Sequence, residues 1–161
     1  MTQDVIMEHG PLIGEKIPHF EIPDEEGNIR TFQNLVGEKG LLLVFVYGTW
    51  CAPCVQTLYS LGRTSEIYQH EGVNVAVASV DDAQILKNFK ATAPTPINFP
   101  LLADHDEALH KLYTSAVAKT YLVIDANGIL RAKFVNADGR SKPSHQALLE
   151  AIQQHLTERT T

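Results

Sequence analysis

The sequence contains two cysteines, Cys51 and Cys54, with an alanine and a proline between them. Two thiols at this spacing can form a reversible disulfide, contribute to a metal site or stay inert. A C-x-x-C pair next to alternating strands and helices is typical of a redox site. Two cysteines supply only half of a four-cysteine zinc site and are too few for the multi-bridge framework of a small secreted scaffold. Reversible thiol chemistry is therefore the leading interpretation.

The position of the pair predicts which thiol is reactive. A continuous apolar run over residues 41–47 predicts a buried strand directly before the motif. The apolar spacing from residue 52 to about residue 70 predicts a helix directly after it. Cys51 would then be the N-cap of this helix, Pro53 its second residue and Cys54 its third. Proline is tolerated there because its missing N–H has no helical partner.

We expect the two thiols to differ in pKa. The helix dipole stabilises a thiolate at Cys51 by up to about 2 kcal/mol, and one pKa unit corresponds to about 1.4 kcal/mol. The pKa of Cys51 would fall from about 8.5 towards about 7, with the Cys54 N–H donating to its sulfur. Cys54, one turn later and more buried, would keep a higher pKa and attack a mixed disulfide at Cys51. Trp50 would offer a flat apolar surface to a partner.

The rest of the chain predicts an α/β domain that positions this motif. We expect parallel and antiparallel strands in one sheet, with helices on both faces. Gly62 is a predicted weak point of the long helix. The predicted elements are a short edge strand over 17–22, a turn over 24–28, a returning strand over 29–32, a strand over 73–80, a helix capped by Asp81 or Asp82, a strand over 99–102, a helix over 104–112 with Asp104 as its N-cap, a strand over 121–124, a hairpin turn over 125–128, a strand over 129–135 and a helix over 143–156.

Length and composition indicate one folded domain. The chain has 161 residues, of which 44% are hydrophobic and 20% are charged, close to the globular average. We expect a single domain over residues 14–157, preceded by a flexible N-terminus over 1–13 and followed by a flexible tail over 158–161.

Charge and hydropathy exclude several classes of partner. With 19 acidic and 13 basic side chains, the net charge is −6, which argues against binding to nucleic acid or an anionic membrane. The strongest apolar run, residues 41–47, is far shorter than the roughly 20 residues of a membrane-spanning helix. The first eight residues carry Asp4 and Glu8 and do not resemble a secretory signal. We expect a cytoplasmic protein that needs neither a metal nor an organic cofactor.

The cysteine motif and several weaker segments resemble the thioredoxin superfamily. Within it they are most similar to the redoxin branch, which holds the alkyl-hydroperoxide-reductase/thiol-specific-antioxidant (AhpC/TSA) family and the TlpA-like thiol-disulfide oxidoreductases. The resemblance implies a thioredoxin-like fold, a central mixed β-sheet flanked by helices with an N-terminal β-hairpin extension. It extends from about residue 14 to residue 156 and rests on residues 14–20, 41–47, 50–54, 99–104, 121–125, 127–128 and Arg131.

The resemblance implies an enzyme with antioxidant or redox-homeostasis activity. The main interpretation is a thiol-disulfide oxidoreductase in which Cys51 attacks and Cys54 resolves, with a reversible Cys51–Cys54 disulfide. The alternative is a peroxiredoxin-like thiol peroxidase that reduces peroxides. The expected partners are thioredoxin or another thiol reductant, a disulfide-bearing protein, or peroxide. The supporting site residues are Thr49, Trp50, Pro53 and Lys119.

The chain departs from the family pattern around the site. Lys119 is expected in the loop before the 121–124 strand, where thioredoxins keep a cis-proline and many peroxiredoxins an arginine. Thr57 replaces the glutamate usually found three residues after the second cysteine. Phe45 replaces the buried acid of thioredoxins, and peroxiredoxins have a threonine where this chain has Cys51. The dithiol is intact, but its usual proton-handling side chains are missing or replaced.

Two non-catalytic hypotheses remain open. Thioredoxin-like copper chaperones add a distant histidine to their two cysteines, but residues 114–120 contain none. A redox-sensing interaction domain without turnover is compatible with Thr57 in place of glutamate. The charged residues 104–107 are interpreted as a solvated helix start. The seven histidines are interpreted as surface residues: His9, His19, His70, His105, His110, His145 and His155.

Overall fold

A five-stranded mixed sheet forms the centre of the computed structural model, which describes residues 10–114, 119–136 and 143–156. Its strands are β3 (Gly40–Val46), β4 (Val73–Ser79), β5 (Leu101–Ala103), β6 (Lys119–Asp125) and β7 (Leu130–Asn136). They lie in the order β5-β4-β3-β6-β7. Strands β3, β4 and β5 are parallel to one another, whereas β6 is antiparallel to both β3 and β7. The predicted mixed sheet is confirmed.

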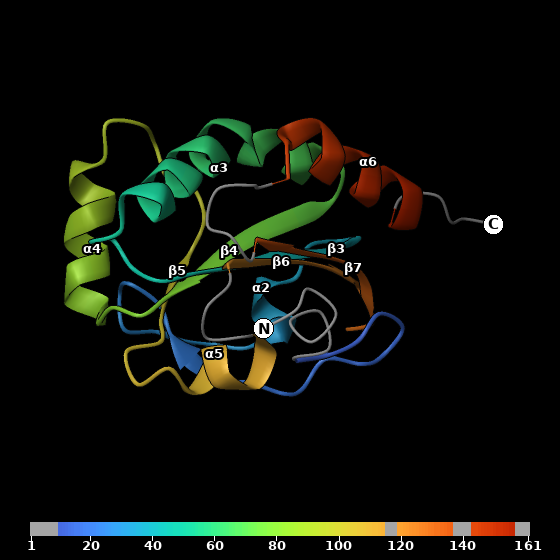
Figure 1. Cartoon of the computed structure of the whole chain (residues 1–161), viewed down its shortest axis with the longest axis horizontal. Helices are drawn as coiled ribbons and strands as arrows, with labels where there is room; N and C mark the ends of the chain where they lie inside the picture. The colour runs from blue at the N-terminus through green and yellow to red at the C-terminus, as the bar shows by residue number, and fades with distance from the viewer. Residues whose placement is uncertain (1–9, 115–118, 137–142, 157–161) are drawn as a thin grey trace.

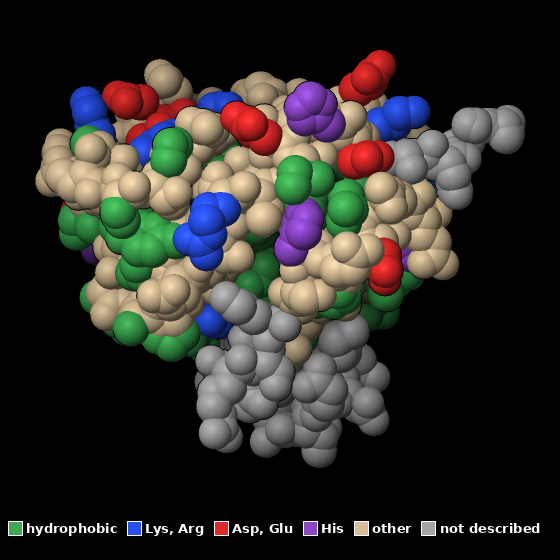
Figure 2. Space-filling view, turned by 90° about the horizontal axis from the view of Figure 1, so that it is seen from above, with side chains coloured by type: hydrophobic (Ala, Val, Ile, Leu, Met, Phe, Trp, Pro, Cys, Tyr) green, Lys and Arg blue, Asp and Glu red, His purple; other side chains and the backbone are tan. Residues whose placement is uncertain are grey.

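Helices cover both faces of this sheet (Figure 1). They are α2 (Phe32–Leu35), α3 (Ala52–His70), α4 (Ala83–Thr92), α5 (Ala108–Tyr113) and α6 (His145–His155). Helices α3 and α6 lie on one face, α2 and α5 on the other, and α4 lies at the β5 side. Acidic and basic side chains are interspersed over the α3 and α6 face (Figure 2). Among these described helices, none combines the length and the apolar character that crossing a membrane requires.

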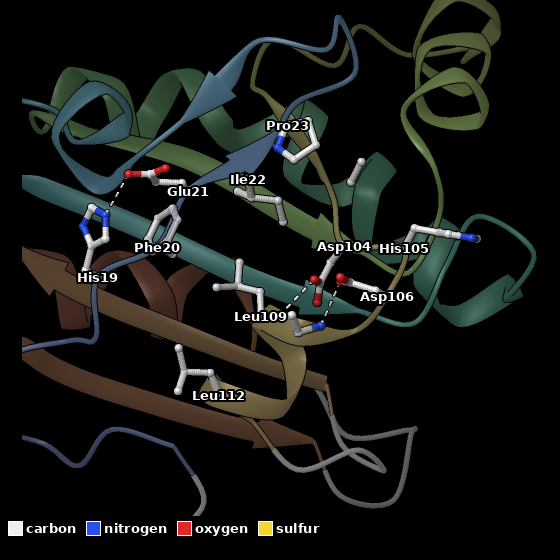
Figure 3. A pocket seen from close by; sticks show the side chains of 12 residues that line it. His19, Phe20, Glu21, Ile22, Pro23, Asp104, His105, Asp106, Leu109 and Leu112 are labelled. Atoms are coloured by element: carbon white, nitrogen blue, oxygen red, sulfur yellow. Dashed lines mark hydrogen bonds and ion pairs between the residues drawn. The ribbon is translucent and has the colours of Figure 1, made fainter.

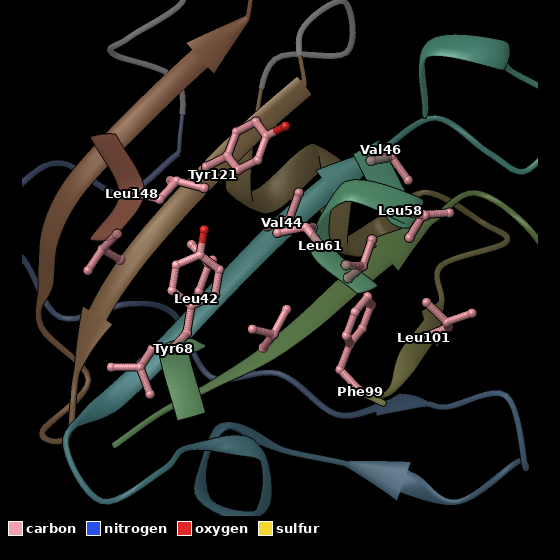
Figure 4. Packing of buried hydrophobic residues seen from close by; sticks show 14 of the residues in the cluster. Leu42, Val44, Val46, Leu58, Leu61, Tyr68, Phe99, Leu101, Tyr121 and Leu148 are labelled. Atoms are coloured by element: carbon pink, nitrogen blue, oxygen red, sulfur yellow. The ribbon is translucent and has the colours of Figure 1, made fainter. Parts of the chain in front are cut away.

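Strand β3 is buried along its whole length because helices cover it from both sides. Its side chains alternate between two apolar clusters, as the pleat of a strand requires. Leu42, Val44 and Val46 pack beneath α3 and α6 (Figure 4), whereas Leu41, Leu43 and Phe45 pack against α2 and α5. Cys54 belongs to the first cluster. The continuous apolar run in the sequence therefore marks a central strand with two covered faces.

The expected N-terminal hairpin is present but shorter than predicted. Strands β1 (Ile22–Pro23) and β2 (Ile29–Arg30) pair antiparallel. Of the strand predicted over 17–22, only Ile22 lies in a strand. The N–H of Ile17 instead donates to the carbonyl of Gly128 in the β6–β7 turn, and the proline at 18 has no N–H with which to continue a ladder.

The prediction of a weak point at Gly62 is wrong, because α3 runs without interruption from Ala52 to His70. A Cβ at position 62 would lie 2.7 Å from the carbonyl oxygen of Pro96. The missing side chain lets the loop after α4 pass directly against the helix. Gly62 therefore serves close packing.

A buried carboxylate ties the hairpin to the outer strand β5. One oxygen of Glu25 accepts the N–H of Leu101 at 3.0 Å, and the other accepts Lys90 Nζ at 2.9 Å. The same ammonium group donates to the carbonyl of Phe99 at 2.9 Å. Burial, the largest influence, acts to raise the pKa of Glu25, but the bonds from Leu101 and Lys90 outweigh it and lower the pKa.

We expect Glu25→Gln to lower the free energy of unfolding by about 2 kcal/mol at neutral pH, the value of a hydrogen bond to a charged group. The folded-state pKa of Glu25 is lowered. Its stabilisation is therefore fully present above the unfolded pKa of about 4.3 and lost as pH falls through the lower folded pKa. Urea unfolding at neutral and acidic pH should show the difference between variant and wild type shrinking in acid.

The matched control is Glu26→Gln, because the carboxylate of Glu26 pairs with Lys87 at 3.3 Å with both side chains half exposed. Its cost should stay below about 1 kcal/mol. Equal losses from both variants would contradict the role assigned to Glu25.

Candidate active site

The junction between β3 and α3 brings the two cysteines together. Cys51 is the N-cap residue of α3, with extended backbone angles of φ −105° and ψ 116°. Pro53 lies in the first turn of the helix, as predicted. Both cysteines are free thiols, Cys51 partly exposed and Cys54 fully buried. One thiol therefore meets solvent while the other lies one helical turn behind it.

The buried sulfur of Cys54 is held by the backbone that follows β3. The N–H of Tyr47 donates to Cys54 Sγ at 3.3 Å. Burial is the main cause that raises the pKa of Cys54, and the adjacent Cys51 thiol raises it further, whereas the N–H groups of Gly48 and Tyr47 oppose the rise. The expected bond from the Cys54 N–H to the Cys51 sulfur is absent, since the Cys51 side chain caps no N–H of α3. The helix therefore begins without a sulfur cap.

Apolar side chains surround the accessible sulfur. Trp50 is 71% exposed. Its indole packs over Gly48, where a Cβ would lie 2.2 Å from the ring nitrogen. Ala52 and Pro53, on the other side of Cys51, are also exposed. These residues form an apolar rim around the Cys51 thiol.

A buried aspartate that the sequence analysis assigned only as a possible cap fixes the loop before the motif. Asp81 Oδ2 accepts the N–H of Thr49 at 2.9 Å and the hydroxyl of Ser79 at 2.7 Å. The helix cap is the next residue, Asp82, which accepts the N–H of Ile85 at 2.9 Å. Asp81 follows the carboxyl end of β4, which meets the carboxyl end of the parallel β3 at the same edge. The position of Asp81 directly after a parallel strand was therefore the sequence signal that could have placed it beside the motif.

A second buried acid reaches the same junction through a histidine. The Nε2 atom of His110 lies 2.8 Å from the carbonyl oxygen of Val46, and its Nδ1 atom lies 2.6 Å from Asp104 Oδ2. A carbonyl only accepts, so Nε2 donates. The Asp104 carboxylate also accepts the N–H groups of Leu109 and His110. Burial acts to raise the pKa of Asp104, but the bonds from the His110 ring and from the backbone together lower it.

This arrangement corrects two sequence interpretations. His110 and Asp104 are only 6% and 2% exposed, so neither is a solvated surface residue. Helix α5 begins at Ala108, four residues later than predicted, after Glu107 turns the chain with a left-handed φ of 64°. Asp104 bonds the first turn of α5 from outside the helix. The His110 ring packs edge-on against Phe45 at 5.1 Å between centroids, a contact that sequence spacing could not reveal.

Comparison with known proteins identifies the family. The AhpC/TSA family model matches residues 13–133. The chain belongs to the AhpC/TSA family.

Individual relatives agree with this assignment. The thiol-disulfide oxidoreductase ResA of Bacillus cereus is 29% identical over 124 residues, which cover 76% of this chain and 69% of ResA. Peroxidoxin BcpB of Mycobacterium tuberculosis superposes with a TM-score of 0.76 at 16% identity, over 92% of this chain and 98% of BcpB. A protein described as a thiol:disulfide interchange protein DsbE, from Chlorobium tepidum, superposes with a TM-score of 0.67 at 24% identity, over 87% and 97%.

These similarities settle the fold and the general class. The two superposed structures show that the fold is thioredoxin-like. The family and the ResA relatives make the chain a thiol-dependent oxidoreductase, of the disulfide-exchange type or the peroxidase type.

Three positions at which we expected departures from the family pattern, Lys119, Thr57 and Phe45, lie near the β3–α3 junction. Lys119 is not in a loop, as expected, but is the buried first residue of β6. Phe45 of β3 pairs with Thr120 of the antiparallel β6. Lys119, one residue before Thr120, therefore lies beside the end of β3 that leads into the cysteine motif. Thr57 is buried, and its hydroxyl donates to the carbonyl of Pro53 at 3.1 Å. Neither Thr57 nor Phe45 can supply the carboxylate that the family resemblance led us to expect there.

A separate cavity of about 480 Å³ opens between the 19–23 segment and α5 (Figure 3). Its walls contain no cysteine, so it is distinct from the dithiol site. Within the described ranges, no group of three or more His, Cys, Asp and Glu side chains is placed to hold a metal ion. The lining residues are His19, Phe20, Glu21, Ile22, Pro23, Ala103, Asp104, His105, Asp106, Ala108, Leu109 and Leu112.

We expect the two thiols to differ in alkylation rate by at least about tenfold at neutral pH, since each unit of pKa changes the thiolate fraction about tenfold. Iodoacetamide should modify Cys51 quickly in the Cys54→Ser variant and Cys54 slowly in the Cys51→Ser variant, measured by mass spectrometry. In urea both variants should react alike. Equal rates in the folded variants would contradict the burial and the raised pKa of Cys54.

We expect Asp104→Asn to lower the free energy of unfolding by about 3 kcal/mol, because it leaves the buried His110 ring without its charged partner. Urea unfolding measures this cost. Asp106→Asn is the control, since that exposed carboxylate accepts the N–H of Ala108 and its loss should cost about 1 kcal/mol or less. If Asp104→Asn left the free energy of unfolding unchanged, the Asp104–His110 pair would not support the junction.

Proposed function

We propose that this protein is a thiol-disulfide oxidoreductase that cycles Cys51 and Cys54 between dithiol and disulfide. The observation that carries the proposal is a partly exposed Cys51 at the N-cap of α3 with the buried Cys54 thiol one turn behind it. The ResA relatives support it, because their name states the same activity. The apolar rim around Cys51 suits docking of a protein that carries a disulfide.

The reaction proceeds in two exchanges. The Cys51 thiolate attacks one sulfur of the partner's disulfide, and the other partner sulfur leaves as a thiolate. The Cys54 thiolate then attacks the Cys51 sulfur. The Cys51–Cys54 bond forms, the bond to the partner breaks, and its electron pair leaves with the partner's second thiolate. Two electrons thus pass to the partner, and thioredoxin or a small thiol returns them.

Electron flow in the opposite direction uses the same steps in reverse. A change of about 30 mV corresponds to only about 1.4 kcal/mol for a two-electron couple. A few hydrogen bonds at the β3–α3 junction therefore decide whether the protein acts as reductant or oxidant. The cytoplasmic location expected from the sequence stays a prediction.

A thiol peroxidase is the second candidate, favoured by the AhpC/TSA family itself. In the family pattern the peroxidatic cysteine aligns with Cys54, which is fully buried here and bonded to the Tyr47 N–H. Lys119 occupies the region of the peroxiredoxin arginine but lacks its bidentate fork. A peroxide would meet Cys51 first: the Cys51 thiolate takes one peroxide oxygen to form a sulfenic acid, the O–O bond breaks, and the other oxygen leaves as water or an alcohol. Cys54 then attacks the sulfenic acid, which loses water and gives the Cys51–Cys54 disulfide.

We expect Cys51→Ser to abolish reduction of a disulfide substrate and Cys54→Ser to stop the reaction at a mixed disulfide. Stopped-flow fluorescence of Trp50, the single tryptophan, follows both steps, and mass spectrometry identifies the trapped adduct. Full activity of Cys51→Ser would refute the proposed nucleophile. Hydrogen peroxide is the second arm: oxidation no faster than that of a free thiol favours disulfide exchange, whereas fast oxidation favours the peroxidase.

A further inference from the structure

The resolving step requires Cys54 to lose its proton inside the protein. Cys54 is fully buried, and its pKa is raised above the usual range for a thiol, chiefly by burial. The two positions where relatives carry acids hold Thr57 and Phe45. Phe45 lies on the opposite face of the sheet. The proton of Cys54 therefore needs another route.

A small cavity lies between α3, α6 and β6, next to the turn of α3 that follows Cys54. Its volume of about 20 Å³ exceeds the roughly 10–15 Å³ that one water molecule requires. Hydroxyl groups and one imidazole line it, so a water there finds several hydrogen-bond partners. The lining residues are Thr57, Ser60, Leu61, Thr64, Tyr68, Tyr121, Pro143, His145 and Leu148.

One wall of the cavity is the turn of α3 that follows Cys54. Thr57 follows Cys54 by one turn of α3, and its hydroxyl donates to the carbonyl of Pro53 at 3.1 Å. Tyr121, from β6, lines the cavity together with Thr57. Tyr121 packs in the same buried cluster as Cys54. Burial raises the pKa of Tyr121, the Thr57 hydroxyl opposes the rise, and the charge of Cys54 adds to it.

The outer end of the cavity reaches a histidine near the surface. The Tyr68 hydroxyl lies 2.9 Å from Nδ1 of His145, the first residue of α6. Figure 4 shows the rings of Tyr68, from α3, and Tyr121, from β6, in one layer between the helices and the sheet. Tyr68 is fully buried and His145 only partly so. The two phenols thus connect the cysteine side of the cavity with its solvent side.

We propose that Tyr121, a water in this cavity and Tyr68 carry the proton of Cys54 to His145 during the resolving step. The inference rests on the proposed disulfide exchange. The Cys54 thiol gives its proton to the Tyr121 hydroxyl, which passes one to the water; the water passes one to the Tyr68 hydroxyl, and His145 Nδ1 takes the last one. The Cys54 thiolate then forms the bond to Cys51, and the electron pair of the broken bond leaves with the partner's thiolate.

Among the side chains that line the cavity, His145 is the one suited to keep the proton. The titratable side chains that line it are Tyr68, Tyr121 and His145. Burial raises the pKa of both tyrosines, so they relay a proton and do not keep their own charge. Histidine changes its charge in the neutral pH range and exchanges protons with solvent. His145 therefore replaces the carboxylate of the relatives from the far side of α3.

The test separates the two exchanges with Ellman's reagent, which needs no physiological partner. Reduced protein releases one coloured thionitrobenzoate when Cys51 attacks and a second when Cys54 resolves. We expect His145→Gln, which keeps a side chain able to bond Tyr68 but removes the base, to slow the second release at least about tenfold. Tyr121→Phe should do the same. The first release should be unchanged, and the pH profile of the second release should differ from that of the wild type.

Tyr113→Phe is the matched control, because this buried phenol bonds the carbonyl of Pro18 on the opposite face of the sheet. It should leave the second release unchanged. Wild-type rates and pH profile in His145→Gln would overturn the relay, as would slowing with an unaltered pH profile, which indicates a structural role. The result for His145→Gln tests the relay even if the Tyr121→Phe variant does not fold. If the wild-type protein never released the second thionitrobenzoate, both the relay and the dithiol chemistry would be overturned. If the wild-type protein released both thionitrobenzoates but did not reduce protein disulfides, only the proposed exchange with protein disulfides would fail.

Discussion

The hydrogen bond from the Tyr47 N–H to the Cys54 sulfur is the contact on which the site depends. The carbonyl of Tyr47 still accepts the N–H of Val80, continuing the parallel pairing of β3 with β4. Its N–H, however, turns from the sheet to the first turn of α3. One residue thus joins the central strand to the buried thiol, and any shift of β3 along the sheet moves the sulfur with it.

Three neighbouring parallel strands each contribute one part of this junction. The cysteine motif follows β3, Asp81 follows β4 and Asp104 follows β5. Asp81 holds the loop through the Thr49 N–H, and Asp104 acts through His110 on the last carbonyl of β3. Residues that follow parallel strands converge at the carboxyl edge of a sheet. Asp81 and Asp104 therefore support the site through the backbone and do not reach the sulfur itself.

The sequence predicted the parts of the site that local patterns determine. The apolar run of β3 and the helical spacing after it placed Cys51 at the N-cap of α3, because both signals lie within a few residues of the motif. His110 could not be found this way, since its partner Val46 is 64 residues away. Lys119 was expected in a loop because the family resemblance aligns it with the loop before the 121–124 strand, whereas β6 begins two residues earlier, at Lys119.

The sequence predicts the fold more completely than the network of polar contacts within it. Gly62 shows why: its role depends on the Pro96 carbonyl that approaches from another loop, which helix propensity does not describe. The contact between Tyr68 and His145 spans 77 residues. Apolar periodicity identifies the face on which a residue lies, but not which hydroxyl it will meet there.

The carboxylate of Glu25 also has a consequence for synthesis of the chain. Its partners Lys90 and Leu101 follow it by 65 and 76 residues. While the ribosome adds the residues up to Leu101, Glu25 of the N-terminal hairpin lacks these partners. The apolar segment that forms strand β3 has been synthesised by then. The nascent chain thus passes through a period in which its most hydrophobic segment lacks its final neighbours, the stage at which chaperones act on slowly completed sheets.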